Sequence, residues 1–425
     1  MKRTLTLMMA LVMVLSVFSV AQAEDVTISL WSFPVLSADG SYEAELIAAF
    51  EAANPGIKVE LQTIDYTAGD DKLNAAIETG KGPDLLIESP QRINKYGSMG
   101  KLVALDDLFT DELKADILNQ GIIGDLGNNG HIWTYPQSIT AHCMVINKDI
   151  WTETGAIKFV NLEGDRTWTT ENFVEACKVL AEAGYTPPAI IYCGGQGGDQ
   201  GTRALISNLY SASFTDDELT KWTFDSEEAI KGLSLMKEMI DAGTLGFDAG
   251  IAAAEEIQLF ANGTIPTSLC WNAVVARNNQ ELMAFTDEAL PFPSDDGVPV
   301  LEGGLFGFGL FDNGDEARIE AAKKFMQFVC HDEVWGPKSV AQTGFFPIYA
   351  SVGDVYAGST DDQLVAFGNF TKYLGKLFNT IPSFTEQRPA WFGMLQEIGT
   401  GTKTAEQAAI DYVTFSNEAQ AQYNK

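Results

Sequence analysis

Residues 26–63 read VTISLWSFPVLSADGSYEAELIAAFEAANPGIKVELQT and contain two strand patterns separated by a helix pattern. Apolar residues alternate with polar ones over 26–30 and again over 57–61, which predicts two strands. Apolar residues recur at helical spacing over 43–53, and Asn-Pro-Gly at 54–56 ends that predicted helix. This order predicts parallel strands joined by a right-handed crossover.

The same pattern continues for one more unit. Residues 73–79 predict a second helix, and Leu-Leu-Ile at 85–87 predicts a short buried strand. The fold class is therefore α/β. In open α/β sheets, ligands bind beyond the carboxyl ends of the strands, and three stretches of this chain reach that edge. The candidate ligand contacts in these stretches are Trp31, Phe33, Tyr66, Glu88, Gln91 and Arg92.

The middle of the chain is rich in predicted helices. Apolar stripes at helical spacing over 169–183 and 225–243 indicate core packing rather than a site. The stretch 193–202 is rich in glycine, which permits tight turns and close backbone approach. Prolines, glycines and acids gather over 291–304, and this composition predicts a connection between two bodies.

The N-terminus has the pattern of a secretory signal. Lys2 and Arg3 precede an apolar run over 5–20, and Ala-Gln-Ala at 21–23 offers the small residues of a cleavage site. The alternative is a membrane anchor, but the run is short for a membrane span. We expect a signal peptide over 1–23, cleaved after Ala23. The mature protein is then exported and soluble, either periplasmic or associated with the cell surface.

Composition excludes several classes of function. The chain has 27 lysines and arginines against 58 acidic residues, a net charge of −31. Such a surface repels phosphate backbones, so nucleic acid is not an expected partner. The five cysteines include no C-x-x-C pair, and we expect buried free thiols rather than a zinc site.

No catalytic or cofactor motif is present in the sequence. There are three histidines, and neither H-E-x-x-H nor G-x-S-x-G occurs. Acidic pairs such as Asp70-Asp71 are expected on a solvated face in so acidic a chain. We therefore expect a protein that is not an enzyme and that has no catalytic residues, no cofactor and no metal site.

Two tryptophans, Trp31 and Trp271, stand at the ends of strand-like segments. An indole plane packs well on the C–H face of a sugar ring, while carboxylates, amides and arginines satisfy the hydroxyl groups. The alternative for any single tryptophan is core packing. Trp31 favours the sugar hypothesis because it falls at the edge that the strand order predicts for a ligand.

Several blocks of sequence resemble, in their order, the family 1 extracellular solute-binding proteins of ABC importers, the group that contains maltose-binding protein. The resemblance covers nearly all of the chain after the signal peptide. The clearest blocks are FEAANPGIKV (50–59), GKGPDLL (80–86), LVALDDL (102–108), RTWTTENF (166–173) and TGFFP (343–347).

The resemblance implies a two-lobed periplasmic-binding-protein fold with a hinged cleft. Each lobe is expected to be a mostly parallel sheet flanked by helices. The implied boundaries are 24–138 plus 304–352 for the N-terminal lobe, and 139–303 plus 353–425 for the C-terminal lobe.

The resemblance also implies site residues in the second lobe and at the lobe crossings. Trp271 matches a common sugar-stacking platform, and Arg388 matches a cleft position on the C-terminal helices. Gln196 and Asp199 lie in the glycine-rich loop. Ser138 and Glu302 stand at two of the implied crossings.

Together these features predict the substrate-binding component of an ABC-type importer. It would capture a sugar or oligosaccharide by hinge closure, act as a monomer and deliver its ligand to the permease subunits. One alternative is a polyol, a glycerol-phosphate-like compound or a peptide as ligand, since Arg92 and Arg388 would suit an anion. A less favoured alternative is an exported glycoside hydrolase, which needs two positioned carboxylates.

Overall fold

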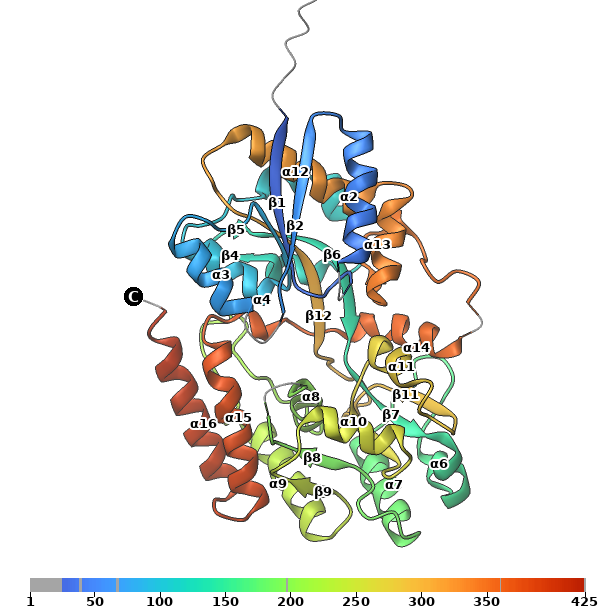
Figure 1. The fold of residues 1–425 in the computed structure, drawn as a ribbon. Helices are drawn as coiled ribbons and strands as arrows, with labels where there is room; N and C mark the ends of the chain where they lie inside the picture. Colours follow the sequence, from blue (N-terminus) through green and yellow to red (C-terminus); the bar gives the residue numbers. More distant parts are fainter. Residues whose placement is uncertain (1–24, 38–39, 66–68, 196–197, 360, 424–425) are drawn as a thin grey trace, which may run out of the picture.

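The computed structural model shows two halves, each built around its own sheet, with the chain passing between them (Figure 1). Three predictions, the signal peptide 1–23, Tyr66 and Gln196, lie outside the residues that the structure describes. Those residues are 25–37, 40–65, 69–195, 198–359 and 361–423.

The first half contains a six-stranded sheet in the order β13-β6-β12-β3-β1-β2. Its strands are β1 (Val26–Ser32), β2 (Ile57–Thr63), β3 (Leu85–Glu88), β6 (Thr134–Ala141), β12 (Gly303–Leu310) and β13 (Phe346–Pro347). The predicted parallel arrangement of the first three strands is confirmed, with Ile28 opposite Val59 and Leu30 opposite both Leu61 and Leu85.

The expectation of a mostly parallel sheet in each lobe is wrong. β12 runs antiparallel to both of its neighbours, β3 and β6, and β13 runs antiparallel to β6. The physical reason is that β12 enters this sheet on the chain's return from the second half. A strand that returns from the other half needs no helical crossover to pair with its neighbour, so it is free to run in the opposite direction.

Helices cover both faces of this sheet. Phe308 on β12 lies beside Phe325, whereas the next residue, Gly309, faces Ile93. Since consecutive strand residues point to opposite faces, the helices that carry Phe325 and Ile93 lie on opposite sides of the sheet. The helices of this half are α2 (Ser41–Ala53), α3 (Gly69–Glu78), α4 (Pro90–Ser98), α5 (Asp111–Asp116), α12 (Glu316–His331) and α13 (Trp335–Thr343).

The second half contains a smaller antiparallel sheet in the order β10-β7-β11. Its strands are β7 (Cys143–Asn147), β10 (Thr267–Trp271) and β11 (Asp287–Leu290). A parallel pair, β8 (Ile190–Tyr192) and β9 (Gly246–Asp248), lies in the same half. Two short strands, β4 (Gly127–Asn128) and β5 (His131–Ile132), pair beside the first sheet.

Helices surround this second sheet, and several begin with a side-chain cap. Thr169, for example, accepts a hydrogen bond from the backbone N–H of Asn172 at 3.2 Å and starts α7. The helices are α6 (Lys148–Thr154), α7 (Thr170–Glu182), α8 (Gln200–Asn208), α9 (Glu227–Asp241), α10 (Ala253–Ala261), α11 (Ala273–Asn279), α14 (Asp362–Phe370), α15 (Phe384–Gly399) and α16 (Ala405–Gln420). Short 3₁₀ turns complete the chain: η1 (Asp106–Leu108), η2 (Gln120–Leu126), η3 (Ala156–Phe159), η4 (Ala350–Val352), η5 (Thr371–Tyr373) and η6 (Phe378–Thr380).

Two crossovers between the halves lie side by side. The chain leaves the first sheet at Ala141 and enters the second at Cys143, and it returns to the first sheet at Gly303. The backbone N–H of His142 donates to the carbonyl of Glu302 at 2.8 Å, which joins the two crossovers. The predicted lobe boundaries fall near these points but stay a prediction.

The five cysteines are buried and free, as expected. Within the described residues, no helix has the length and apolar character that a membrane span requires. The same part of the chain contains no cluster of three or more histidine, cysteine or acidic side chains that could hold a metal ion.

Candidate functional site

The carboxyl edge of the first sheet carries an aromatic and charged cluster. Trp31 lies inside β1 rather than beyond it, and it is 8% exposed. Phe33 follows the strand and is fully buried. The guanidinium of Arg92 lies 4.9 Å from the centre of the Phe33 ring, and its Nη1 donates to Oε1 of Glu88 at 3.0 Å. The structure therefore brings the predicted residues Phe33, Glu88 and Arg92 together.

Arg92 is held by a second carboxylate, one that the sequence pattern placed on a solvated face. Its Nε donates to Oδ1 of Asp70 at 2.9 Å, and its Nη2 donates to Oδ2 at 3.3 Å. Asp70 is only about half-exposed, since its side chain retains 45% of its accessible surface. The spacing could not reveal this pair because the two residues come from different helices, α3 and α4.

Two lysines stand next to the same cluster. The Lys72 ammonium lies 5.6 Å from the centre of the Trp31 ring. Burial lowers the pKa of Lys95, and the carboxylates of Asp70 and Glu386 oppose this change. Glu386 belongs to α15 in the second half, so α4 lies close to α15 here. Gln91, also a predicted contact, is half-buried on the same helix.

The crossover strand β6 contributes three buried polar side chains. Side-chain polar atoms of Gln137, Ser138 and Thr140 have no hydrogen-bond partner among the described residues. The register of β6 against β12 shifts between Pro136 and Ser138, so Gln137 is the extra residue of a β-bulge. Bulges re-aim side chains and are common beside binding sites. Buried polar groups are ordinarily satisfied, so these atoms keep hydrogen-bonding capacity for a bound molecule.

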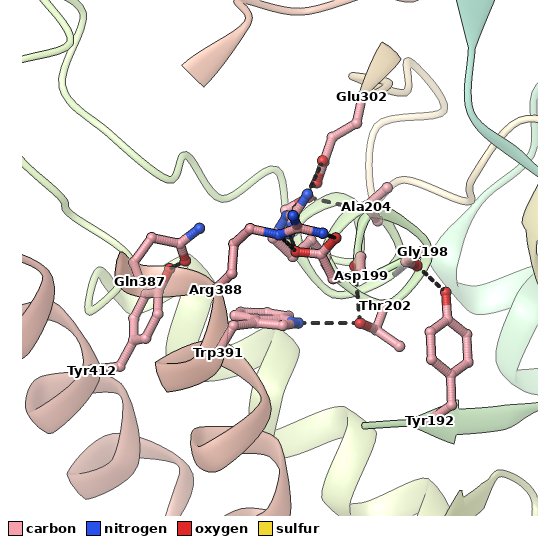
Figure 2. A network of polar contacts seen from close by, with 12 residues as sticks. Tyr192, Gly198, Asp199, Thr202, Ala204, Glu302, Gln387, Arg388, Trp391 and Tyr412 are labelled. Atoms are coloured by element: carbon pink, nitrogen blue, oxygen red, sulfur yellow. Dashed lines mark hydrogen bonds and ion pairs between the residues drawn. The ribbon is translucent and has the colours of Figure 1, made fainter. Parts of the chain in front are cut away.

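A buried charge network lies in the second half, directly below the crossovers (Figure 2). Arg203 on α8 donates from Nε to Oε1 of Glu302 at 3.2 Å and from Nη2 to Oε2 at 2.8 Å. Its Nη1 also donates to Asp199, one helical turn earlier. Arg388 on α15 donates to the same carboxylate, from Nε to Oδ2 at 2.9 Å and from Nη2 to Oδ1 at 2.7 Å.

Burial and charge act in opposite directions in this network. Burial alone would raise the pKa of Asp199, but the guanidinium groups of Arg203 and Arg388 lower it below its usual value. Burial also raises the pKa of Glu302, and the bidentate contact with Arg203 opposes that rise. Two guanidinium groups and two carboxylates balance, so the network is neutral when all four are ionised.

The network is surrounded by buried aromatic rings. Trp391 donates from its indole N–H to Oγ1 of Thr202 at 3.1 Å, and Tyr192 donates to the carbonyl of Gly198 at 2.5 Å. Tyr412 donates to Oε1 of Gln387 at 2.5 Å. The first two bonds hold α8 between β8 and α15, as Figure 2 shows, and the third joins α16 to α15.

Trp271 is placed differently from an exposed stacking platform. It ends β10 as expected, but it is fully buried and packs edge-on against Phe260 with ring centres 5.2 Å apart. Its indole N–H has no hydrogen-bond partner among the described residues. The role of Trp271 as a ligand contact stays a prediction.

Arg203 and His142 were also not among the contacts predicted from the sequence. Arg203 stands four positions after Asp199, a spacing that places both on one helix face and that could have predicted the pair. His142 sits in the first crossover, and Asn272 donates to its Nδ1 at 3.4 Å. Burial and the nearby Arg203 lower the pKa of His142 to about 4, so it is neutral at pH 7.

Two surface cavities of about 530 and 370 Å³ lie elsewhere on the molecule. The larger is lined mainly by α9, with Glu406 of α16, and the smaller by residues of β8, β9 and the turns next to them. Neither cavity is lined by a residue of the cluster around Arg92 (Phe33, Asp70, Glu88) or of the charge network around Arg203 (Asp199, Glu302, Arg388). The candidate site is therefore defined by its polar groups and not by these cavities.

The chain belongs to the family of bacterial extracellular solute-binding proteins, whose pattern matches residues 34–333. This confirms the resemblance found in the sequence. Because the family is one of solute-binding proteins, the prediction of a binding protein rather than an enzyme is also confirmed.

Three known proteins illustrate what the chain is similar to. The sugar-binding protein MalE from Xanthomonas citri shares the fold, with a TM-score of 0.77, 15% identity and coverage of 94% of this chain and 98% of that one. The cyclic alpha-maltosyl-1,6-maltose binding protein from Arthrobacter globiformis gives a TM-score of 0.76, 17% identity and coverage of 93% and 99%. A maltooligosaccharide ABC transporter solute-binding lipoprotein of Streptococcus pneumoniae is 31% identical over 110 residues, which are 26% of this chain and 25% of that protein.

Proposed function

We propose that this protein is the substrate-binding component of an ABC-type importer and that it captures a neutral sugar or oligosaccharide between its two halves. Hinge motion at the crossovers between the halves would close them on the ligand, and the closed form would then dock on the permease subunits. The family and the sugar-binding proteins with the same fold support this proposal.

One observation bears most directly on the ligand: the arginines at the site are already matched by carboxylates. Arg92 pairs with Asp70 and Glu88, and Arg388 pairs with Asp199. An anionic ligand would have to displace these partners, and the buried carboxylate of Glu88 would lose its ion pair with Arg92, which is costly. A neutral ligand rich in hydroxyl groups can use the remaining hydrogen-bonding capacity without that cost.

The same observation argues against the alternatives. A glycerol-phosphate-like ligand would need a guanidinium that is not already engaged, and Arg92 and Arg388 each donate to carboxylates. A peptide would bring a charged terminus to the same groups. A glycoside hydrolase needs two positioned carboxyl groups at the scissile bond, whereas Asp199 is held ionised by two arginines and both carboxylate oxygens of Glu302 accept from Arg203. A neutral polyol remains compatible with the geometry, and titration with sorbitol compares it directly with a sugar.

The proposal extends to the lobes, the oligomeric state and the location of the protein. The lobes would be 24–138 plus 304–352 and 139–303 plus 353–425. The protein would work as a monomer, exported by the signal peptide 1–23 and retained in the periplasm or at the cell surface. The crossovers at His142 and Glu302 would serve as its hinge.

Isothermal titration with maltotriose, sorbitol and glycerol 3-phosphate tests the ligand class. We expect heat of binding with the sugar and none with the phosphate. Trp31→Leu keeps an apolar side chain but removes the indole face, and it should weaken sugar binding at least tenfold. Trp151→Leu, at a buried tryptophan on α6 in the second half, is the matched control and should bind like the wild type. Binding of glycerol 3-phosphate alone would refute the sugar assignment.

A further inference from the structure

Arg203 lies at the junction of segments that are far apart along the chain. Besides Asp199 and Glu302, its guanidinium faces two aromatic rings, with centres 5.6 Å away at Phe378 and 5.3 Å away at Phe384. These partners belong to α8, the second crossover, η6 and α15. The Arg203 side chain therefore connects the second crossover to η6 and α15, two segments near the C-terminus.

We propose that Arg203 is a positioning residue that couples ligand contact at Arg388 to the crossover at Glu302, and that it thereby sets the balance between open and closed forms. This inference rests on the proposed function, since it assumes a hinged solute receptor. Ligand selectivity would remain with the residues that touch the ligand.

Arg203 is engaged within the protein rather than with a ligand, since its Nε, Nη1 and Nη2 all donate to carboxylates of the chain. Its side chain retains 3% of its accessible surface, whereas that of Arg388 retains 24%. Asp199, which joins the two arginines, is 1% exposed. A change at the surface of Arg388 therefore reaches Arg203 through the shared Asp199 carboxylate.

From Arg203 the connection continues to the hinge. Both carboxylate oxygens of Glu302 accept from Arg203, and the carbonyl of the same residue accepts from His142 in the other crossover. The next residues on each strand, Ala141 and Gly303, are already paired in the first sheet. Glu302 thus stands where the two strands separate, and the position of its side chain constrains both crossovers.

A second route leads from Arg203 to the first half. Phe378 follows Leu377, whose backbone N–H donates to Oδ2 of Asp125 at 3.2 Å. Asp125 belongs to η2 in the first half and is buried. Movement of the halves relative to each other would strain this contact, and Arg203 supports the segment on which it depends.

The chemistry of the network favours discrete states. Burying charges is tolerated only while each guanidinium keeps its carboxylates, because an unpaired buried charge is strongly destabilising. A partly opened network is therefore unfavourable, and the crossover is held in either one arrangement or another. Elements with two such arrangements are what hinge transitions require.

The experiment measures the distance between the halves with and without the coupling residue. Val334 and Ile410 are exposed, on the first half and on α16 respectively, and both are replaced by cysteine and spin-labelled. The five native cysteines are buried and stay unlabelled in the folded protein. Pulsed dipolar spectroscopy then gives the distance distribution without ligand and with maltotriose.

We expect Arg203→Lys, which keeps the charge but loses the bidentate fork, to broaden the ligand-free distribution and shift its mean. The dissociation constant for maltotriose should rise by about 2- to 30-fold, the range found for residues that modulate coupling between sites. The order of preference among maltose, maltotriose and glucose should stay as in the wild type.

Arg166→Lys is the matched control. Arg166 is also buried and pairs with a glutamate, Glu288, at 2.9 Å, but its other hydrogen bonds go to Ala289 and Gln363 rather than to His142 or Glu302. Arg166→Lys should lower the free energy of unfolding but leave the distance between the two spin labels unchanged. Should Arg203→Lys fail to fold, Glu302→Gln takes its place, with Glu288→Gln as control.

The outcomes separate the two proposals. An Arg203→Lys protein with the distance distribution of the wild type overturns the coupling role, whether or not maltotriose binds. A shifted ligand-free distribution supports the coupling role, even in a protein that does not bind maltotriose. Failure of the wild type to bind maltotriose counts against the proposed ligand alone.

Discussion

Arg388 and Asp199 form a bidentate ion pair, with Nε–Oδ2 and Nη2–Oδ1 distances of 2.9 and 2.7 Å, although 189 positions separate them in the chain. The pair fastens α15 to the start of α8. Because Arg203 uses the same carboxylate, Asp199 carries two positive partners at once.

Removal of Asp199 should therefore be one of the most destabilising single changes in the second half. Asp199→Ala leaves the Arg203 and Arg388 guanidinium groups without their shared counter-charge, and we expect a loss of about 3–5 kcal/mol in the free energy of unfolding. Urea denaturation at pH 7 measures this loss in the free energy of unfolding. Asp241→Ala removes an exposed partner of Lys237 and should change stability by less than about 1 kcal/mol. Equal effects of the two variants would contradict the buried network.

Glu256 should make the protein less stable as the pH rises. Its carboxyl group is fully buried, accepts from Ser268 Oγ at 2.6 Å and from the N–H of Leu269 at 2.7 Å, and burial raises its pKa to about 8. The folded state therefore holds a proton that the unfolded chain releases above about pH 4.5, so this contribution to stability falls between about pH 4.5 and pH 8.

Glu256→Gln tests this by removing the ionisable group. Between pH 5 and pH 8 the free energy of unfolding should fall less in Glu256→Gln than in the wild type. The difference should be a few kcal/mol, since each unit of pKa shift is worth about 1.4 kcal/mol. Glu228→Gln, at an exposed position, is the control and should leave the decline unchanged.

The lowered pKa of His142 should make the protein less stable as the pH falls. Burial and the charge of Arg203 lower its pKa to about 4, below the usual value of 6.5. Between these values the unfolded chain binds a proton that the folded protein does not, so stability is lost as the pH falls from about 6.5 to about 4. His142→Gln should reduce that loss in unfolding experiments at pH 7 and pH 4.5. The exposed His131→Gln should not, and a loss that is the same in all three proteins would disprove the assignment.

Close packing of α8 depends on Gly201. A Cβ atom there would lie 2.3 Å from the Tyr192 hydroxyl and 2.4 Å from the carbonyl oxygen of Leu269. Gly201→Ala should lower the melting temperature and cost about 1–3 kcal/mol, as overpacking does. Gly393→Ala, inside α15, is the contrasting control. Nothing lies within 4 Å of the place that its methyl group would take, and it should stabilise the protein by up to about 1 kcal/mol.

The sequence predicted those elements of the fold whose positions follow from local hydrophobic patterns. The first three strands and the helices between them follow from alternation and helical spacing, and they occur at the expected places as β1, β2, β3, α2 and α3. The direction of β12 could not be predicted this way. Its apolar run looks the same in either direction, and its neighbours, β3 and β6, are set by the path of the chain through the second half.

The candidate site, too, was predicted only in part. The strand-edge argument and the family resemblance identified Glu88, Arg92 and Arg388, but they left the arginines available for an anion. Their partners, Asp70 and Asp199, come from other helices, and only the three-dimensional arrangement shows that the charges are already matched. The buried position of Trp271 was likewise invisible, because a tryptophan at a strand end looks the same whether its ring faces solvent or the core.

The place of β12 between β3 and β6 has a consequence for how the protein is made. The second sheet has all of its strands once residue 290 has been synthesised, whereas the first sheet still lacks β12, which ends at residue 310, and β13 at residues 346 and 347. Until then β3 and β6 have no strand between them, and their backbone groups stay unpaired along those edges. The half that begins the chain is therefore the last to complete its sheet, and the nascent protein passes most of its synthesis with its first domain unfinished.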